Sequence, residues 1–169
     1  MSRLRLRREQ PDLAVGPGER LLAWATDTEG EVVGGTRDAL YLTEPDRTPV
    51  RVPWQQVEAA DWDKDGSVLT VSEVGTWGQV RRQHRVTIDE PGRLLELVRE
   101  RVTASIVLQR HVAVRGRRGV RVIARRAPHS HGEIAWFVEY DAGVEPDDPT
   151  VRAAVEEALT AARGEVGAG

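Results

Sequence analysis

Arginine is concentrated between residues 110 and 126, where its side chains could bind oxyanions. Guanidinium donates forked hydrogen bonds to phosphate or carboxylate, which the lysine ammonium does not, and Lys64 is the one lysine among 24 basic residues. On an extended strand, Arg121 and Arg125 would face outward beside Ile123. The residues that would then face the core are Val120, Val122 and Ala124. The candidate anion-binding or partner-binding residues are Arg115, Arg117, Arg118, Arg121, Arg125 and Arg126.

Three interpretations of this segment remain open. Its guanidinium groups could follow a nucleic-acid backbone, could pair with an acidic partner or with the chain's own acidic C-terminal helix, or could reflect the codon bias of a GC-rich genome. Residues 80–126 carry 13 basic and 4 acidic residues, whereas residues 9–80 carry 5 and 14 and residues 133–169 carry 2 and 9. Because the acidic segments repel phosphate, we expect little nucleic-acid binding.

Residues 61–66 (Asp-Trp-Asp-Lys-Asp-Gly) match the first half of a calcium-binding loop. The bidentate glutamate of such a loop should follow at position 72, which is Ser72, and Glu73 comes one position late. We therefore predict a solvated hairpin turn here. His129 and His131 offer two imidazoles, but the sequence suggests no third ligand nearby. We predict neither a metal site nor a cofactor.

Catalytic patterns are also missing from the sequence. The chain has no cysteine, which removes thiolate chemistry and disulfides. It has no Gly-x-Ser-x-Gly motif, and its glycine-rich stretches lack the following Lys-Ser/Thr of a phosphate-binding loop. We therefore expect a non-catalytic protein.

The length of 169 residues suits one compact unit with an extension. No window of about 18 apolar residues predicts a membrane span, and the N-terminus lacks the order of a signal peptide. The expected location is therefore the cytoplasm. The net charge of −3 does not by itself select a partner.

Short runs of β-favouring residues recur between turn signals from residue 20 to residue 88. They predict seven antiparallel strands, at residues 21–26, 31–33, 39–43, 50–53, 57–62, 68–72 and 82–88. The period then changes, because Leu94, Val98, Val102 and Ile106 recur four residues apart. This spacing predicts a helix over residues 91–108.

Three more strands and a second helix are expected after this helix. The strands are predicted around residues 112–114, 120–127 and 134–140, and the helix over residues 149–164, with Asp148 before it and Pro149 as its first residue. The predicted organisation is a basic arm (1–14), a barrel with its helix (15–109) and an extension packed on it (110–169). Trp54 and Trp136 are expected to be core anchors.

Residues 36–42 (Thr-Arg-Asp-Ala-Leu-Tyr-Leu) and 50–57 (Val-Arg-Val-Pro-Trp-Gln-Gln-Val) resemble a recurring sequence motif of bacterial pleckstrin-homology-like domains. The resemblance covers about residues 15–109, and the whole chain is similar to actinobacterial proteins of unknown function. It implies a mostly β, α+β fold: a seven-stranded antiparallel barrel with a C-terminal helix. It also implies an oligomerising or partner-binding module. The acidic residues 27–31 disfavour phosphoinositide binding at the corresponding loop.

The helix–three strands–helix order of residues 91–164 resembles that of double-stranded-RNA-binding domains. Residues 147–150 (Asp-Asp-Pro-Thr) stand where those domains carry lysines, so this resemblance ranks second. We therefore expect a non-catalytic binding or scaffolding module with a protein partner or self-association. Nucleic-acid binding through residues 110–126 is the alternative.

Overall fold

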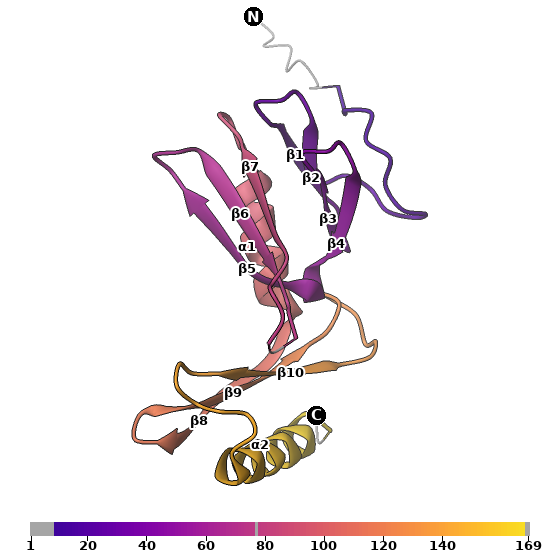
Figure 1. Ribbon diagram of the computed structural model, residues 1–169. Helices are drawn as coiled ribbons and strands as arrows, with labels where there is room; N and C mark the ends of the chain where they lie inside the picture. The colour runs from indigo at the N-terminus through magenta and orange to yellow at the C-terminus, as the bar shows by residue number, and fades with distance from the viewer. Residues whose placement is uncertain (1–8, 77, 168–169) are drawn as a thin grey trace, which may run out of the picture.

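The computed structural model describes residues 9–76 and 78–167, so residues 1–8 of the predicted basic arm lie outside the described part. The fold is α+β and mostly β, with three antiparallel sheets and two α-helices in the described chain (Figure 1). The mixed class predicted from the sequence is therefore confirmed.

Sheet A is a four-stranded meander formed by β1 (Ala23–Thr26), β2 (Val32–Gly35), β3 (Ala39–Thr43) and β4 (Pro49–Pro53). Leu40 lies opposite Val52 in the β3–β4 ladder, and both are fully buried. Burial alternates along β1, whereas residues 39–42 of β3 are all buried, so the middle of the sheet is covered on both faces.

Sheet B is a three-stranded meander formed by β5 (Val57–Asp63), β6 (Val68–Glu73) and β7 (Gln83–Thr87). The β5–β6 connection is the predicted hairpin turn, in which the Asp65 amide donates to Asp63 Oδ1 at 3.1 Å. β5 pairs only with β6 among the described strands, so its other edge is not part of a sheet.

The predicted closed barrel is wrong, because these seven strands form two separate sheets. A 3-10 helix, η1 (Trp54–Gln56), follows β4 directly and redirects the chain before β5 begins. Pro53, at the end of β4, has no N–H to continue a ladder. Elsewhere the sheets approach closely enough for the Thr28 amide to donate to the Thr87 carbonyl at 2.9 Å.

The two sheets and the first helix, α1 (Leu94–Ser105), enclose one core. Trp54 is its largest fully buried side chain, and the indole N–H donates to the Thr36 carbonyl at 3.0 Å. A Cβ at Gly35 would lie 2.6 Å from Leu97 of α1, so glycine permits the close approach of the helix to β2. Trp54 is therefore confirmed as a core anchor.

The first helix is shorter than predicted, ending at Ser105 instead of residue 108. Ile106, expected on the helical stripe, is instead the first residue of β8 (Ile106–Arg115). β-Branched Ile106 and Val107 favour the extended conformation, and the Ser105 carbonyl accepts the Arg126 amide at 2.9 Å, which begins the pairing of the next sheet.

Sheet C has the order β10-β9-β8, with β9 (Arg118–Arg125) between β8 and β10 (Ala135–Tyr140). α2 (Pro149–Gly167) covers one face of it, and the β5–β7 and β1–β4 sheets lie on the other side of sheet C (Figure 1). Asp148 accepts the Thr150 amide at 2.8 Å, which confirms the predicted start of the helix. α2 runs to Gly167 rather than residue 164, and an Arg110–Glu165 ion pair holds its last turn.

Trp136 is only partly buried, in contrast to the prediction that it anchors a core. It lies on the edge strand β10 with the Arg163 guanidinium 5.7 Å from its ring centroid. α1 packs mainly on sheets A and B while α2 packs on sheet C, so the two helices belong to different layers. Neither described helix is long and apolar enough to cross a membrane.

Candidate functional site

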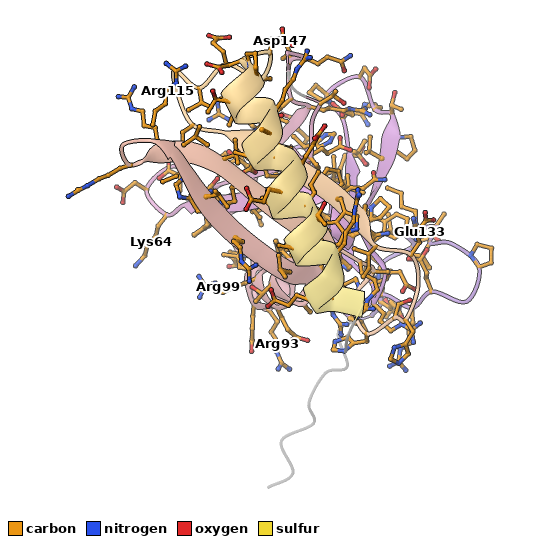
Figure 2. All side chains as sticks on the ribbon, turned by 90° about the horizontal axis from the view of Figure 1, so that it is seen from below. Lys64, Arg93, Arg99, Arg115, Glu133 and Asp147 are labelled. Carbon is orange, nitrogen blue, oxygen red and sulfur yellow. The ribbon has the colours of Figure 1, made fainter. Side chains whose placement is uncertain are left out.

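Most of the predicted arginine site is engaged with the chain's own polar groups. Arg115 pairs with Asp148 at the start of α2, and Figure 2 shows Arg115 near that end of the helix. Arg118 Nη1 donates to the Ala142 carbonyl at 3.2 Å, and Arg121 pairs with Glu139 across the β9–β10 ladder at 3.4 Å.

Two predicted residues, Arg117 and Arg126, have no side-chain ion pair or hydrogen bond within the described residues. Arg117 is exposed at the β8–β9 turn and Arg126 is half-buried after β9. Arg117 and Arg126 do not form a continuous stripe with the other four predicted arginines, because Arg125 of β9 lies between sheet B and sheet C. A row of free guanidinium groups along β9 is therefore not present.

Arg125 does not face outward into solvent as predicted, because its residue is only 3% exposed. Its Nη1 donates to the Val57 carbonyl at 3.0 Å and its Nη2 to the Glu58 carbonyl at 3.3 Å. The side chain does leave sheet C on the face opposite α2, but sheet B covers that face. Burial lowers the pKa of the Arg125 guanidinium, and the Glu139 and Glu58 carboxylates oppose this effect.

The contact between sheet B and sheet C surrounds a cavity of about 150 Å³ that contains a pair of carboxyl groups. Glu58 of β5 hydrogen-bonds to Glu139 of β10, and Arg81 pairs with Glu58. Arg125 also lines this cavity. The cavity walls further include Val74, Gly75, Thr76, Gly78, Gln79, Ile123, Phe137, Val138 and Tyr140.

The Glu58 carboxyl group holds a proton near neutral pH. Burial, followed by the hydrogen bond and charge of Glu139, raises the pKa of Glu58 from 4.5 to about 7, and the charges of Arg81 and Arg125 oppose this rise only in part. Two hydrogen-bonded carboxyl groups need one proton between them.

A buried histidine also joins sheet A to sheet B. His84 of β7 is 3% exposed, with Nδ1 2.8 Å from Glu44 after β3 and Nε2 2.8 Å from Glu73 of β6. This cluster was not predicted, and its one local signal in the sequence is a histidine at an apolar position of an alternating strand. No group of three metal-ligating side chains forms a metal centre in residues 9–76 and 78–167.

An apolar groove lies between α1 and the β5–β6 hairpin, with a volume of about 420 Å³. Its apolar lining residues are Ala60, Trp62, Leu69, Leu95, Val98 and Val102. Asp61 and Arg99 stand at its polar margin, and Figure 2 shows Arg99 and Lys64 of the hairpin projecting on the same side of the molecule. The groove runs beside the edge of β5 that pairs with no other described strand.

Comparison of the chain with protein-family models, with curated proteins and with solved structures finds no match.

Proposed function

We propose that the protein is a non-catalytic binding module whose partner is another protein, and that an extended segment of this partner adds to β5. The observation that carries the proposal is an edge of β5 that no other strand of residues 9–76 and 78–167 pairs with, lying beside an apolar groove. Strand addition gives affinity through main-chain hydrogen bonds, and a neighbouring pocket gives specificity by accepting side chains of the added strand.

The charges of the groove indicate which segment would fit. Asp61, Asp63 and Asp65 are exposed along the strand and turn on one side, and Arg99 is exposed on the helix. An extended segment with an apolar residue for the groove and a basic residue toward the hairpin complements these charges. The first residues of β5 are not available for pairing with an added strand, because Arg125 already donates to the carbonyls of Val57 and Glu58.

We further infer that residues 15–109 form a pleckstrin-homology-like sandwich. Antiparallel sheets of four and three strands in chain order, followed by a helix that packs against both, support this inference. Fold alone does not set function, so the protein-binding proposal rests on the groove and the β5 edge.

Nucleic-acid binding through residues 110–126 is the alternative that this proposal ranks second. Ion pairs of Arg115 with Asp148 and of Arg121 with Glu139 support that ranking, because a phosphate would have to displace a carboxylate that is already in place. Arg117 remains free for phosphate at the hairpin tip, and a single contact gives little affinity.

The test selects binders of the whole protein from a random-peptide display library and measures their affinity. Selected peptides should bind Leu95→Glu at least about tenfold more weakly, because a carboxylate would enter an apolar groove. Thr103→Glu places the same charge at the exposed margin and should also weaken binding, which covers the case in which Leu95→Glu unfolds.

Val80→Glu is the matched control, since Val80 is fully exposed and does not line the groove. Equal affinity for Thr103→Glu and wild type would contradict the proposal, as would a selection that yields no binder. Tight oligonucleotide binding that weakens steeply with salt and is lost in Arg117→Ser would make nucleic acid the partner.

A further inference from the structure

Arg101 occupies a position of α1 that normally carries an apolar side chain. It follows Leu94 and Val98 on the helix face that packs on the core, and its side chain is only 13% exposed. Guanidinium Nε and Nη1 are buried and have no hydrogen-bond partner among the described residues. Its ion pair is with Glu100, at 3.6 Å from Nη2, and the Glu100 side chain is 58% exposed.

A charge buried in this way is costly, because it has lost water without gaining the hydrogen bonds that replace it. Buried arginines are normally paired, and most buried polar atoms have at least one hydrogen-bond partner. Because Nε and Nη1 are enclosed by the protein, Nη2 is the donor of Arg101 that a ligand can reach, and a negative charge beside it would offset part of the cost of burial.

Arg101 lines a cavity of about 350 Å³ together with two other arginines, Arg20 and Arg37. The cavity lies where the segment before β1 and the β2–β3 turn meet α1, and its remaining lining residues are Gly18, Glu19, Leu22 and Asp38. Leu22 is one of the large apolar residues left exposed, at 38%. The cavity lining thus combines guanidinium donors with one large, partly exposed apolar side chain.

The carboxylates of this cavity already have cationic partners. Glu19 accepts hydrogen bonds from Thr36 at 2.6 Å and from Arg51 at 3.2 Å, and Tyr41 also donates to it. Burial raises the Glu19 pKa, but these hydrogen bonds outweigh burial and hold the pKa at about 2, so the group stays ionised.

Asp38 lies 3.5 Å from Arg37 Nε, and no hydrogen bond or ion pair engages the Arg20 side chain within the described residues. Pairing Glu19 with Arg51, Asp38 with Arg37 and Glu100 with Arg101 leaves the positive charge of Arg20 uncompensated. A ligand with one negative charge would neutralise the cavity, whereas a dianion would leave excess negative charge beside Asp38.

We propose that this cavity binds a monocarboxylate with an apolar substituent, its oxygens held by Arg101 and Arg20 and its apolar group on Leu22. Guanidinium groups suit the planar carboxylate through paired N–H···O bonds. The carboxylate can belong to a small molecule or to the C-terminus of a peptide. This site uses other residues of α1 than the groove beside β5, so it stands independently of the proposed function.

Calorimetric titration of the full chain tests the site with three probes: isocaproate, a short peptide ending in leucine and inorganic phosphate. We expect saturable binding of isocaproate, of the free-acid peptide or of both, and loss of peptide binding when its C-terminus is amidated. Binding of isocaproate alone assigns the site to small molecules, and tighter binding of the peptide assigns it to chain ends.

The variants separate ligand binding from a structural role. Arg20→Gln changes an exposed side chain and should weaken carboxylate binding about tenfold or more. Arg101→Met should abolish binding while leaving the melting temperature equal or higher, because it removes a largely buried charge whose Nε and Nη1 have no hydrogen-bond partner among the described residues. Arg93→Gln, directly before α1 and outside the cavity, should bind like wild type.

No saturable binding of either carboxylate probe would overturn the proposal. Unchanged binding by Arg20→Gln, equal binding of the amidated peptide, or tighter binding of phosphate than of isocaproate would overturn it as well. If Arg101→Met fails to fold, Arg20→Gln alone decides the outcome.

Discussion

Replacing Glu58 by glutamine should remove a pH dependence of stability that the contact between sheets B and C creates. In the folded protein the pKa of Glu58 is raised from 4.5 to about 7, first by burial and then by the hydrogen bond to Glu139. The folded state therefore binds a proton that the unfolded chain releases above pH 4.5. This contribution to stability is fully present below pH 4.5 and is lost as the pH rises through about 7.

The size of this stability effect follows from the pKa shift of Glu58 and from the exposure of its side chain. Each pH unit between the two pKa values contributes at most about 1.4 kcal/mol. The Glu58 side chain is 13% exposed at an open cavity, and solvent screening reduces the total to about 1–2 kcal/mol. For a chain of this length, about 2–4 °C of melting temperature corresponds to 1 kcal/mol.

The assay is urea and thermal unfolding of wild type and Glu58→Gln at pH 5 and pH 8. Histidines also titrate in this range, so the difference between the two proteins is the quantity to compare. We expect Glu58→Gln to match wild type at pH 5 and to exceed it by about 1–2 kcal/mol at pH 8. Glu157→Gln, at an exposed site of α2, is the control. A wild-type advantage that grows from pH 5 to pH 8 would refute the reasoning.

Three further predictions concern stability. Trp54→Ala should cost about 3–5 kcal/mol in urea unfolding, because the side chain is fully buried, and Trp136→Ala should cost less, because it is only partly buried; equal losses would contradict the burial difference. Glu19→Gln should lower the free energy of unfolding by about 2 kcal/mol at pH 7. Since the Glu19 pKa is lowered to about 2, this difference from wild type should vanish as the pH falls from 4.5 to 2, and a difference that persists at pH 2 would argue against the ionic cluster. Arg125→Met should cost about 2–4 kcal/mol, because the carbonyls of Val57 and Glu58 lose their donor; a neutral result would show that this contact does not hold sheet C to sheet B.

Local sequence patterns predicted most of the strands and the start of the second helix. Runs of β-favouring residues between turn signals placed β3 and β5 within a residue of their observed bounds, and Asp148 followed by Pro149 marked the start of α2. Such features depend on neighbours in the sequence, which is why they can be derived without a structure.

Features that depend on the packing of distant layers could not be derived in this way. Alternation correctly places Arg125 on the face of β9 opposite Val122, but it does not show that sheet B covers that face. Glu58 and Glu139 are far apart in the chain, and no spacing rule brings them together. The closed barrel was expected because strand count alone does not distinguish one continuous sheet from two.

The most direct test of the central claim is NMR mapping of the protein's amide chemical shifts while a library-selected peptide is added. Binding along β5 predicts shift changes in residues 59–63 and in the facing part of α1, residues 95–103, together with the indole N–H of Trp62. The β8–β9 hairpin should remain unchanged. Shift changes concentrated at Arg117 and its neighbours, with β5 unaffected, would contradict the account.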